Sequence, residues 1–398
     1  MKTITQITGA SIAALLFSFT GCSKMDETST GDSGKNATKE MMKENGNNPD
    51  EAVFRNSSKM RSSIYVYTES NDSGNNSVLI YKRNGAGDLE LVGTEASGGA
   101  GNALGLGSQG ALTLDADHKF LYAVNAGSNS ISSFRVLPNG NLMLKQTINS
   151  QGITPVSLAI HEDILYVVHS GDGTINGFHL GPNGTFSHIA GSHKNLSSAM
   201  AGPAEIAFSP NGNHLYVTEK MTNTISTFSV NNAGVAGSRV STPSVGNTPF
   251  GFDFARDQYM IVSNADGGTA NLSSVTSYSG VNSGNLAAVN GAIPNNQTAA
   301  CWVATTMYGR YAFISNTGSD DVSSYYVGAG GNLSIIEENI PSGDSPIDLV
   351  VASDNYSVYV LCAMDHTIQQ YKRTELGGLT HTGIVHSLPV HAAGLATW

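Results

Sequence analysis

The sequence predicts an all-β fold, a seven-bladed β-propeller built from four-stranded antiparallel blades. Three observations lead to this prediction: the composition, a strand type that recurs seven times, and a C-terminal segment that supplies a strand missing from the first repeat. Glycine makes up 45 of the 398 residues, and Asn, Ser and Thr are also dense. Gly, Asn and Ser favour turns, while Val, Ile, Tyr, Phe and Thr favour strands, so long helices are excluded as the main material.

Charge and hydropathy narrow the classes of function. Asp and Glu number 31 against 20 Lys and Arg, which gives a net charge of −11. Nucleic-acid-binding surfaces are basic, so we expect no nucleic-acid partner. Only 13% of the residues are charged, but 40% are hydrophobic, and this excludes a disordered chain.

The N-terminus has the form of an export signal. A basic Lys2 precedes an apolar run from Ile12 to Phe17, and the run ends in Thr20-Gly21-Cys22. The run is too short for a spanning helix, which needs about 20 apolar residues. Cys22 stands where bacterial lipoproteins carry their lipidated cysteine, and Thr-Gly-Cys resembles their cleavage box. The alternative is an ordinary secretory signal with an incidental cysteine.

These features divide the chain into three parts. We expect residues 1–21 to be a lipoprotein signal peptide, residues 22–61 a polar flexible tether, and residues 62–398 the propeller. The protein would then lie in the bacterial cell envelope, attached to a membrane only through its lipid anchor, as a monomer.

The repeated unit contains four strands. One strand of the Leu-Tyr-Val type recurs at residues 64–67, 121–124, 165–168, 215–218, 260–263, 312–315 and 358–361. A second strand follows each, centred on Tyr81, Phe134, Phe178, Phe228, Tyr278, Tyr325 and Tyr371. A Gly-bearing turn then predicts a hairpin to a third strand, and a short strand, often opened by proline, precedes most units. Residues 62–398 divided by seven give about 48 residues per unit, which is typical of propeller blades.

The two ends of the predicted ring complement each other. The first unit lacks its opening strand, and residues 389–398 (Pro-Val-His-Ala-Ala-Gly-Leu-Ala-Thr-Trp) have that form. We therefore expect the C-terminal strand to join blade one and close the ring, which leaves no open sheet edge.

Two cysteines remain within the propeller region, Cys301 and Cys362. An exported protein could pair them in a disulfide. They fall at different places in neighbouring units, so we favour two small buried side chains instead.

One segment carries a family resemblance. Residues 208–217 (Phe-Ser-Pro-Asn-Gly-Asn-His-Leu-Tyr-Val) are similar to the Phe-Ser-Pro-Asp-Gly-x-x-Leu-Tyr-Val segment of the seven-bladed lactonase family, which includes propeller-type 6-phosphogluconolactonases. Residues 122–125, 261–264 and 314–316 loosely resemble the tyrosine-valine-threonine-asparagine repeats of bacterial propellers. The resemblance implies a propeller and hydrolysis of a lactone.

The family's site residues do not transfer cleanly. In the pattern that the resemblance implies, Arg-His follows the proline before this segment, and a Glu lies just past the next strand. Here Ala204 and Glu205 follow Pro203, and Lys220 stands at the place of that Glu. A phosphorylated sugar lactone is disfavoured because the chain is acidic and poor in arginine.

Polar residues nevertheless gather at one predicted end of the ring. Innermost strands converge on the axis, and the second residue after the proline of such a strand is Ser157, Glu205, Gly251, Asp348 or His391. Loops after the following strands contribute His169, Glu219 with Lys220, Asp320 with Asp321, and Asp365 with His366. Loops of this kind often carry function.

Lactone hydrolysis requires a base for water, a donor for the oxyanion and an acid for the leaving alkoxide. We assign the base to Glu205 or Asp348, the oxyanion donor to Lys220 and the acid to His391. Substrate contacts fall to Ser157, His169, Glu219, Asp365 and His366.

The alternative is that these groups only hydrate the channel or bond to loop backbone. The protein would then be a non-catalytic module that binds a sugar, a peptide or an envelope protein.

We expect neither a metal nor a cofactor. The aspartate-bearing loops lack the spacing of a calcium loop, so they are interpreted as turns. The Gly-x-Gly-x-x-Gly run at residues 105–110 precedes a strand and opens no helix, unlike a dinucleotide-binding loop.

Overall fold

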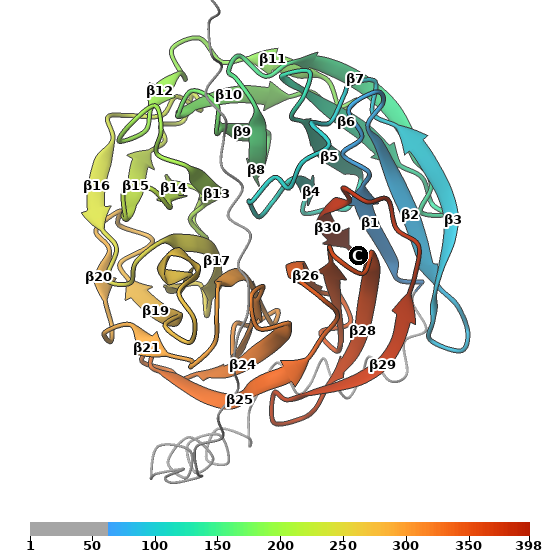
Figure 1. The fold of residues 1–398 in the computed structure, drawn as a ribbon. Helices are drawn as coiled ribbons and strands as arrows, with labels where there is room; N and C mark the ends of the chain where they lie inside the picture. The colour runs from blue at the N-terminus through green and yellow to red at the C-terminus, as the bar shows by residue number, and fades with distance from the viewer. Residues whose placement is uncertain (1–62) are drawn as a thin grey trace, which may run out of the picture.

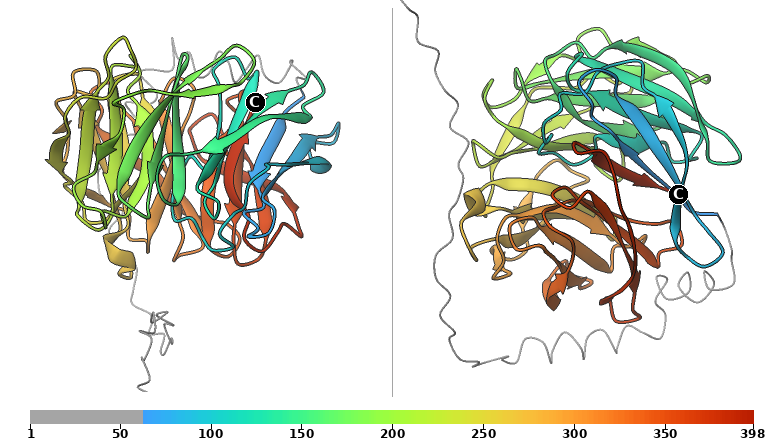
Figure 2. Two further views of the ribbon diagram at one scale, coloured as in Figure 1. Left: turned by 90° about the horizontal axis from the view of Figure 1, so that it is seen from above. Right: turned by 45° about the vertical axis from the view of Figure 1, so that its right-hand side comes forward.

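The chain forms a closed ring of seven four-stranded β-sheets, as the sequence predicts (Figure 1). The computed structural model describes residues 63–398, so the expected signal peptide and tether, with Cys22, lie outside the described residues. Two of the seven sheets carry a fifth short strand at their outer edge. The side view shows the strands running between the two faces of a disc (Figure 2).

Each blade contributes one strand to each of four concentric layers. The innermost strands of blades 1 to 7 are β30 (Ala393–Thr397), β4 (Leu112–Leu114), β8 (Pro155–His161), β13 (Pro203–Phe208), β17 (Pro249–Ala255), β22 (Ala300–Thr305) and β26 (Pro346–Val351). The second strands are β1 (Tyr65–Glu69), β5 (Phe120–Asn125), β9 (Ile164–His169), β14 (His214–Glu219), β18 (Tyr259–Asn264), β23 (Tyr311–Asn316) and β27 (Ser357–Cys362).

The two outer layers complete the blades. The third strands are β2 (Ser77–Arg83), β6 (Ser130–Val136), β10 (Thr174–Leu180), β15 (Thr224–Ser229), β19 (Ser274–Ser279), β24 (Asp321–Val327) and β28 (Thr367–Arg373). The outermost strands are β3 (Leu89–Ala96), β7 (Leu142–Asn149), β11 (Phe186–His188) with β12 (Lys194–Asn195), β16 (Val240–Pro243), β20 (Ala287–Ala288) with β21 (Ile293–Pro294), β25 (Leu333–Pro341) and β29 (Leu379–Val385). One 3-10 turn among residues 63–398, η2 (Asp266–Gly268), lies between β18 and β19.

The tyrosine of the Leu-Tyr-Val strand joins one blade to the next. Tyr166 of blade 3 donates its hydroxyl to the carbonyl of Gly234 in blade 4 at 2.7 Å, and Tyr216 of blade 4 bonds Val281 of blade 5 in the same way. Tyr67 of blade 1 likewise reaches Gly140 of blade 2. The ring itself is buried between the two sheets, so this position combines apolar burial with a satisfied hydroxyl.

Glycine in the outer hairpin permits the close approach of the blades. Gly140 has φ +76°, and a Cβ atom there would lie 2.1 Å from the ring of Tyr65. A side chain would therefore both strain the turn and push blade 1 away from blade 2. The repeated Gly-bearing turn thus reflects packing between blades as well as turn geometry.

The C-terminal strand closes the ring, as expected. β30 pairs antiparallel with β1, with Thr397 opposite Val66. The Trp398 indole stacks on Tyr65, with ring centroids 5.3 Å apart, and its Nε1 donates to the hydroxyl of Tyr67 at 2.9 Å. The last strand of the chain is therefore the innermost strand of blade 1.

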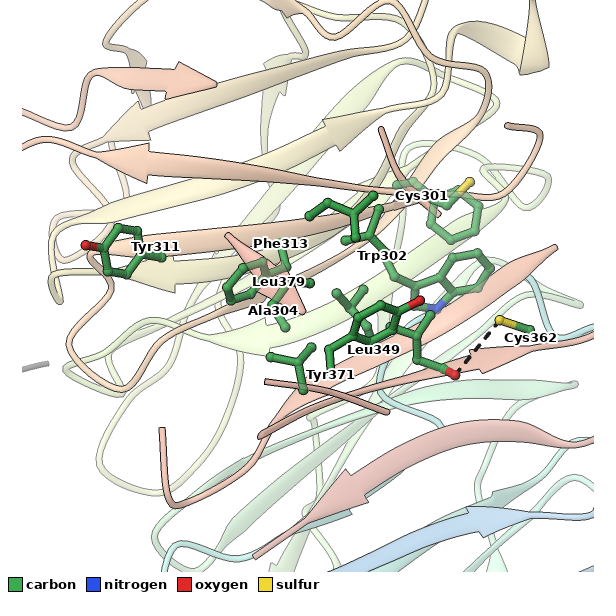
Figure 3. Packing of buried hydrophobic residues seen from close by; sticks show 14 of the residues in the cluster. Cys301, Trp302, Ala304, Tyr311, Phe313, Leu349, Cys362, Tyr371 and Leu379 are labelled. Atoms are coloured by element: carbon green, nitrogen blue, oxygen red, sulfur yellow. Dashed lines mark hydrogen bonds between the residues drawn. The ribbon is translucent and has the colours of Figure 1, made fainter. Parts of the chain in front are cut away.

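Both cysteines are free and buried, which confirms the interpretation as apolar core residues. Cys301 and Cys362 belong to the largest hydrophobic cluster, which packs blades 6 and 7 together around Trp302 and Leu349 (Figure 3).

Deletion of residues 389–398 should abolish the monomeric fold. The deletion removes β30, exposes the inner edge of β1 and leaves Tyr65 and Tyr67 without Trp398. An open strand edge of this kind pairs with other chains. Size-exclusion chromatography should show oligomers or aggregates, and the thermal unfolding transition should broaden or vanish.

The single variant Trp398→Ala serves as the milder test, with an expected loss of about 2 kcal/mol in the free energy of unfolding. A truncated chain that stays monomeric and melts at the wild-type temperature would contradict this account of closure.

Candidate active site

The candidate site lies where the innermost strands begin and the second strands end, and we call this end of the ring the mouth face. The register fixes this end in each blade: Pro155 pairs with His169, Pro203 with Glu219 and Pro346 with Cys362. A register shift directly after each of these prolines turns the next residues out of the regular ladder.

Carboxyl groups on the innermost strands link neighbouring blades. One Glu205 oxygen accepts the N–H of Phe252 in blade 5 at 2.6 Å. One Asp348 oxygen accepts the N–H of Leu395 in the closing strand at 2.9 Å, and the other accepts the N–H of Leu349. Innermost strands are sheet edges, so the N–H groups on their axis-facing edge have no partner strand. The carboxyl side chains supply a hydrogen-bond acceptor for these N–H groups.

The same link recurs with other side chains. Ser157 accepts the N–H of Ile206 from blade 4 at 3.2 Å. Asp253 accepts the N–H of Thr305 from blade 6 at 2.8 Å. Sequence reasoning missed Asp253 because it took the second residue after each proline, which is Gly251 in blade 5.

Gly251 lacks a side chain because another segment of the chain occupies the space beside it. The Gly105–Gly110 run crosses the hub, and Figure 1 shows the chain before β4 turning toward the middle of the ring. A Cβ atom on Gly251 would lie 2.2 Å from Oε1 of Gln109. The crossing segment therefore requires glycine at position 251. In the sequence, the absence of a polar residue at this position of the repeat was the signal for that requirement.

The crossing segment bonds to blades 3, 4 and 6 around the axis. The Gln109 amide pairs with Val303 of blade 6 like a strand, since Oε1 accepts its N–H at 2.9 Å and Nε2 donates to its carbonyl at 2.8 Å. The Gln109 backbone N–H donates to Ala204 of blade 4 at 2.9 Å, and the Ser108 hydroxyl donates to Val156 of blade 3 at 2.8 Å. The Gly-x-Gly-x-x-Gly run is thus a structural element of the hub, and it opens no helix.

Lys220 is tied to this segment. Its amine donates to the carbonyl of Gly107 and lies 4.7 Å above the ring centroid of Phe250. Burial lowers the pKa of Lys220 to about 8, because the charged form loses its hydration. Burial raises the pKa of the nearby Cys301 thiol to about 12, although the Lys220 charge opposes this shift.

Burial favours the neutral form of the hub carboxyls. Burial raises the pKa of Asp348 to about 8, although the two backbone N–H bonds work against the shift. Burial also raises the pKa of Glu205 well above its usual range, and the charges of Asp253 and Asp348 add to that shift. Glu205 and Asp348 therefore lie close enough to interact electrostatically.

His391 and the loop residues lie elsewhere on the mouth face. His391 is half-buried in the turn before β30. Among residues 63–398, no hydrogen bond or ion pair joins His391 to Glu205 or Asp348. Asp365 is exposed and holds a turn, accepting the hydroxyl of Thr367 at 3.0 Å, and His366 is half-buried beside it.

His169 and Glu219 occupy equivalent places at the ends of second strands and are fully buried. The His169 ring nitrogens contact the carbonyls of Thr174 and Ser150 at 3.2 and 3.1 Å, and burial lowers its pKa. Glu219 accepts bonds from Ser197, Thr222 and Ser226. Both side chains therefore brace the loops of their own blade.

Within residues 63–398, no group of three or more His, Cys, Asp or Glu side chains is arranged to hold a metal ion. No helix in the same range reaches the length and hydropathy that a membrane span requires.

The protein should become less stable as the pH rises from about 5 to 8. Asp348 and Glu69, a buried carboxyl at the end of β1, both have a pKa raised to about 8. Between the unfolded pKa values and pH 8 the folded state holds these protons and the unfolded state does not. Unfolding therefore releases protons, and stability falls with rising pH.

Urea unfolding at several pH values measures this slope. Asp348→Asn, which is neutral at every pH, should reduce the number of protons released near pH 6 by about one. The matched control Asp88→Asn removes an exposed carboxylate and should leave the slope unchanged. Equal slopes in the wild type and Asp348→Asn would show that Asp348 is ionised in the folded protein.

The sequence matches the model of one known protein family. The family model described as "Lactonase, 7-bladed beta-propeller" matches residues 27–189, 161–296 and 283–393. A search of curated proteins found no match.

Several solved structures share the fold. One from Bacteroides fragilis, described as a candidate 6-phosphogluconolactonase, is 19% identical with a TM-score of 0.69, covering 85% of this chain and 98% of its own. One from Bacteroides uniformis with the same description is 20% identical with a TM-score of 0.69, covering 84% and 99%.

The periplasmic gluconolactonase of Pseudomonas aeruginosa is 16% identical with a TM-score of 0.68, covering 84% and 98% of the two chains. At these identities the structural likeness establishes the fold alone. The family model spans nearly the whole propeller, and the chain belongs to the seven-bladed β-propeller lactonase family.

Proposed function

We propose that the protein hydrolyses a small lactone at the hub of the mouth face. Family membership supports a lactone hydrolase in general terms. The observation that carries the proposal is the pair of buried, interacting carboxyls on innermost strands, Glu205 and Asp348. Asp348 has a pKa of about 8, and a general base works best when its pKa lies near the operating pH.

Asp348 keeps capacity for a water molecule. A carboxylate has about four lone-pair sites, and the N–H groups of Leu349 and Leu395 use two of them. Once ionised, Asp348 would take a proton from water as the water attacks the lactone carbonyl. Glu205 would stay neutral and keep blade 5 in place through Phe252.

Lys220 and His391 would complete the reaction. The charged Lys220 ammonium group has three N–H donors, and one of them bonds to the carbonyl of Gly107. Another can donate to the oxyanion that forms on the carbonyl oxygen of the lactone. His391 would protonate the alkoxide that leaves when the ring C–O bond breaks. Ser157, His169, Glu219, Asp365 and His366 remain proposed substrate contacts, of which Asp365 is the most accessible.

A second candidate is a non-catalytic module that binds an envelope ligand. One specific observation favours it: Glu205 and Asp348 both already bond to backbone N–H groups of the next blade. That role alone explains two buried carboxyls at the hub. Turnover therefore separates the two candidates, whereas geometry alone satisfies both.

A panel of lactones at pH 6 to 9 tests the proposal. The panel comprises gluconolactone, its 6-phosphate and neutral alkyl lactones, each corrected for uncatalysed ring opening. The wild type should open at least one neutral lactone faster than buffer, with a rate that rises from pH 6 to about 8, as Asp348 ionises, and falls above it, as Lys220 loses its proton. Asp348→Asn should lose about a hundredfold or more in kcat, and it should lose the rise with pH.

The control Asp88→Asn should retain the wild-type rate, and thermal melts should show that each variant is folded. If no member of the panel is opened, the binding module is the better description.

For location, we propose export and a lipid anchor on Cys22 in the bacterial cell envelope, with the propeller as a monomer. The support is the basic, apolar and Thr-Gly-Cys pattern of the first 22 residues. Labelled palmitate should enter the wild type in a bacterial host and fail to enter Cys22→Ala. Labelling of both would place the lipid on another residue.

A further inference from the structure

Seven large apolar side chains stand exposed on the mouth face, around the hub rather than in it. We call this set the apolar rim: Leu104, Ile153, Met200, Met221, Leu272, Met364 and Val390. Each is more than half exposed, and the three methionines are 81%, 74% and 72% exposed. Soluble monomers rarely gather exposed apolar groups on one face unless that face binds something.

Packing does not account for the methionines. In six blades the residue two places after the second strand donates its N–H to the loop before the innermost strand, and these residues are Gly127, Gly171, Met221, Asp266, Gly318 and Met364. Three of the other blades thus build the same contact with glycine, and one builds it with Asp266. Met221 and Met364 add a long side chain that projects into solvent at the same point.

The charge around the rim is one-sided. The mouth-face loops carry six aspartates that are exposed or half-buried: Asp72, Asp172, Asp266, Asp320, Asp344 and Asp365. Two described basic residues lie at this end of the blades: Lys220, which points to Gly107 at the hub, and Lys194 in the short outer strand β12. Eight of the other described basic residues lie at the opposite ends of the blades: Lys82, Arg83, Lys119, Arg135, Arg256, Arg310, Lys372 and Arg373.

This combination selects one kind of occupant. Flexible methionines adapt to irregular apolar surfaces, and an acidic surround attracts a cation and repels anionic lipids or phosphates. Thioether and aliphatic side chains are poor hydrogen-bonding partners for the hydroxyl groups of a sugar. The rim also extends over loops from blade 1 to blade 7, so a single small ligand at the hub would not contact it all.

We propose that the mouth face docks a basic amphipathic helical segment of a partner protein, with its apolar side on the apolar rim and its Lys or Arg side chains beside the loop aspartates. In such a contact the apolar anchors would give affinity and the charges would set the orientation. The proposal is separate from the assigned chemistry, since it uses none of Glu205, Asp348, Lys220 or His391; it shares only Asp365, which is also a proposed substrate contact.

Peptide binding to the full chain tests the proposal. The probe is a helical peptide of leucine and lysine, about 18 residues long, with leucine on one face. Fluorescence anisotropy should show saturable binding that weakens when salt is raised from about 0.05 to 0.3 M. A leucine–glutamate peptide and a scrambled leucine–lysine peptide should bind at least tenfold more weakly.

Two matched triple variants locate the contact. Met200→Ser with Met221→Ser and Met364→Ser should weaken binding of the leucine–lysine peptide at least tenfold. Leu91→Ser with Val92→Ser and Val240→Ser alters three other exposed apolar residues, on the outermost strands β3 and β16, and it should bind like the wild type. Methyl NMR of labelled methionines should shift the signals of the three rim methionines on peptide addition.

Other outcomes overturn the proposal. Equal binding by both triple variants, or by the scrambled peptide, would mean attraction by net charge alone. A wild-type dimer that the rim variant abolishes would assign the rim to a second copy of this chain. Loss of alkyl-lactone turnover in the rim variant, without peptide binding by the wild type, would assign it to the apolar tail of a substrate.

Discussion

The backbone N–H groups on the free edges of the innermost strands set the constraint on which the hub depends. Seven sheets can form a ring only if their inner edges meet near one axis, where an edge strand has no further strand to pair with. Ser157, Glu205, Asp253 and Asp348 each accept such an N–H from the following blade. Gln109 does the same for Val303, at the end of a segment that crosses the hub. Neighbouring blades are thereby joined by directional bonds in addition to apolar packing.

Among these residues, Asp348 is the one that holds the ring closed, because its partner Leu395 belongs to the closing strand. A single carboxyl therefore connects the last blade to the chain's own C-terminus. Burial keeps it neutral near pH 7, and a neutral acid still accepts an N–H bond through its carbonyl oxygen. Structural and catalytic use of such a group are compatible only if ionisation leaves the N–H bonds in place. Those bonds favour the ionised form, so they would remain when Asp348 acts as a base.

Much of the architecture could be predicted because it repeats. Seven Leu-Tyr-Val strands and their period indicate the blade count, and the tail residues match the missing strand. The hub was harder to predict because side-chain direction there depends on register shifts after each proline, which the sequence does not display. Gly251 illustrates the point: the polar link of blade 5 comes from Asp253, two residues later, because Gln109 occupies the space beside Gly251.

The same limit applies to His169 and Glu219. Their places at strand ends on the mouth face follow from the sequence, but their burial does not. Both side chains turn into their blade, where loop hydroxyls and carbonyls satisfy them. An alternating strand pattern predicts which face a residue takes within a strand, and it loses that power at the last residue.

The polar side chains at the hub take part in ring closure, and this limits which residues can adapt to a binding partner. Polar side chains that already bond to backbone have little freedom to adapt to a partner, whereas the loops above them are fixed by main-chain bonds and leave their side chains available. Met221 and Met364 stand at a loop position that Gly127 and Gly171 fill elsewhere, so the repeat itself tolerates either. Under the proposed docking, variation at such positions would change what the mouth face binds without disturbing the links between blades. The proposed recognition on the rim and the proposed chemistry at the hub could therefore change independently in this fold.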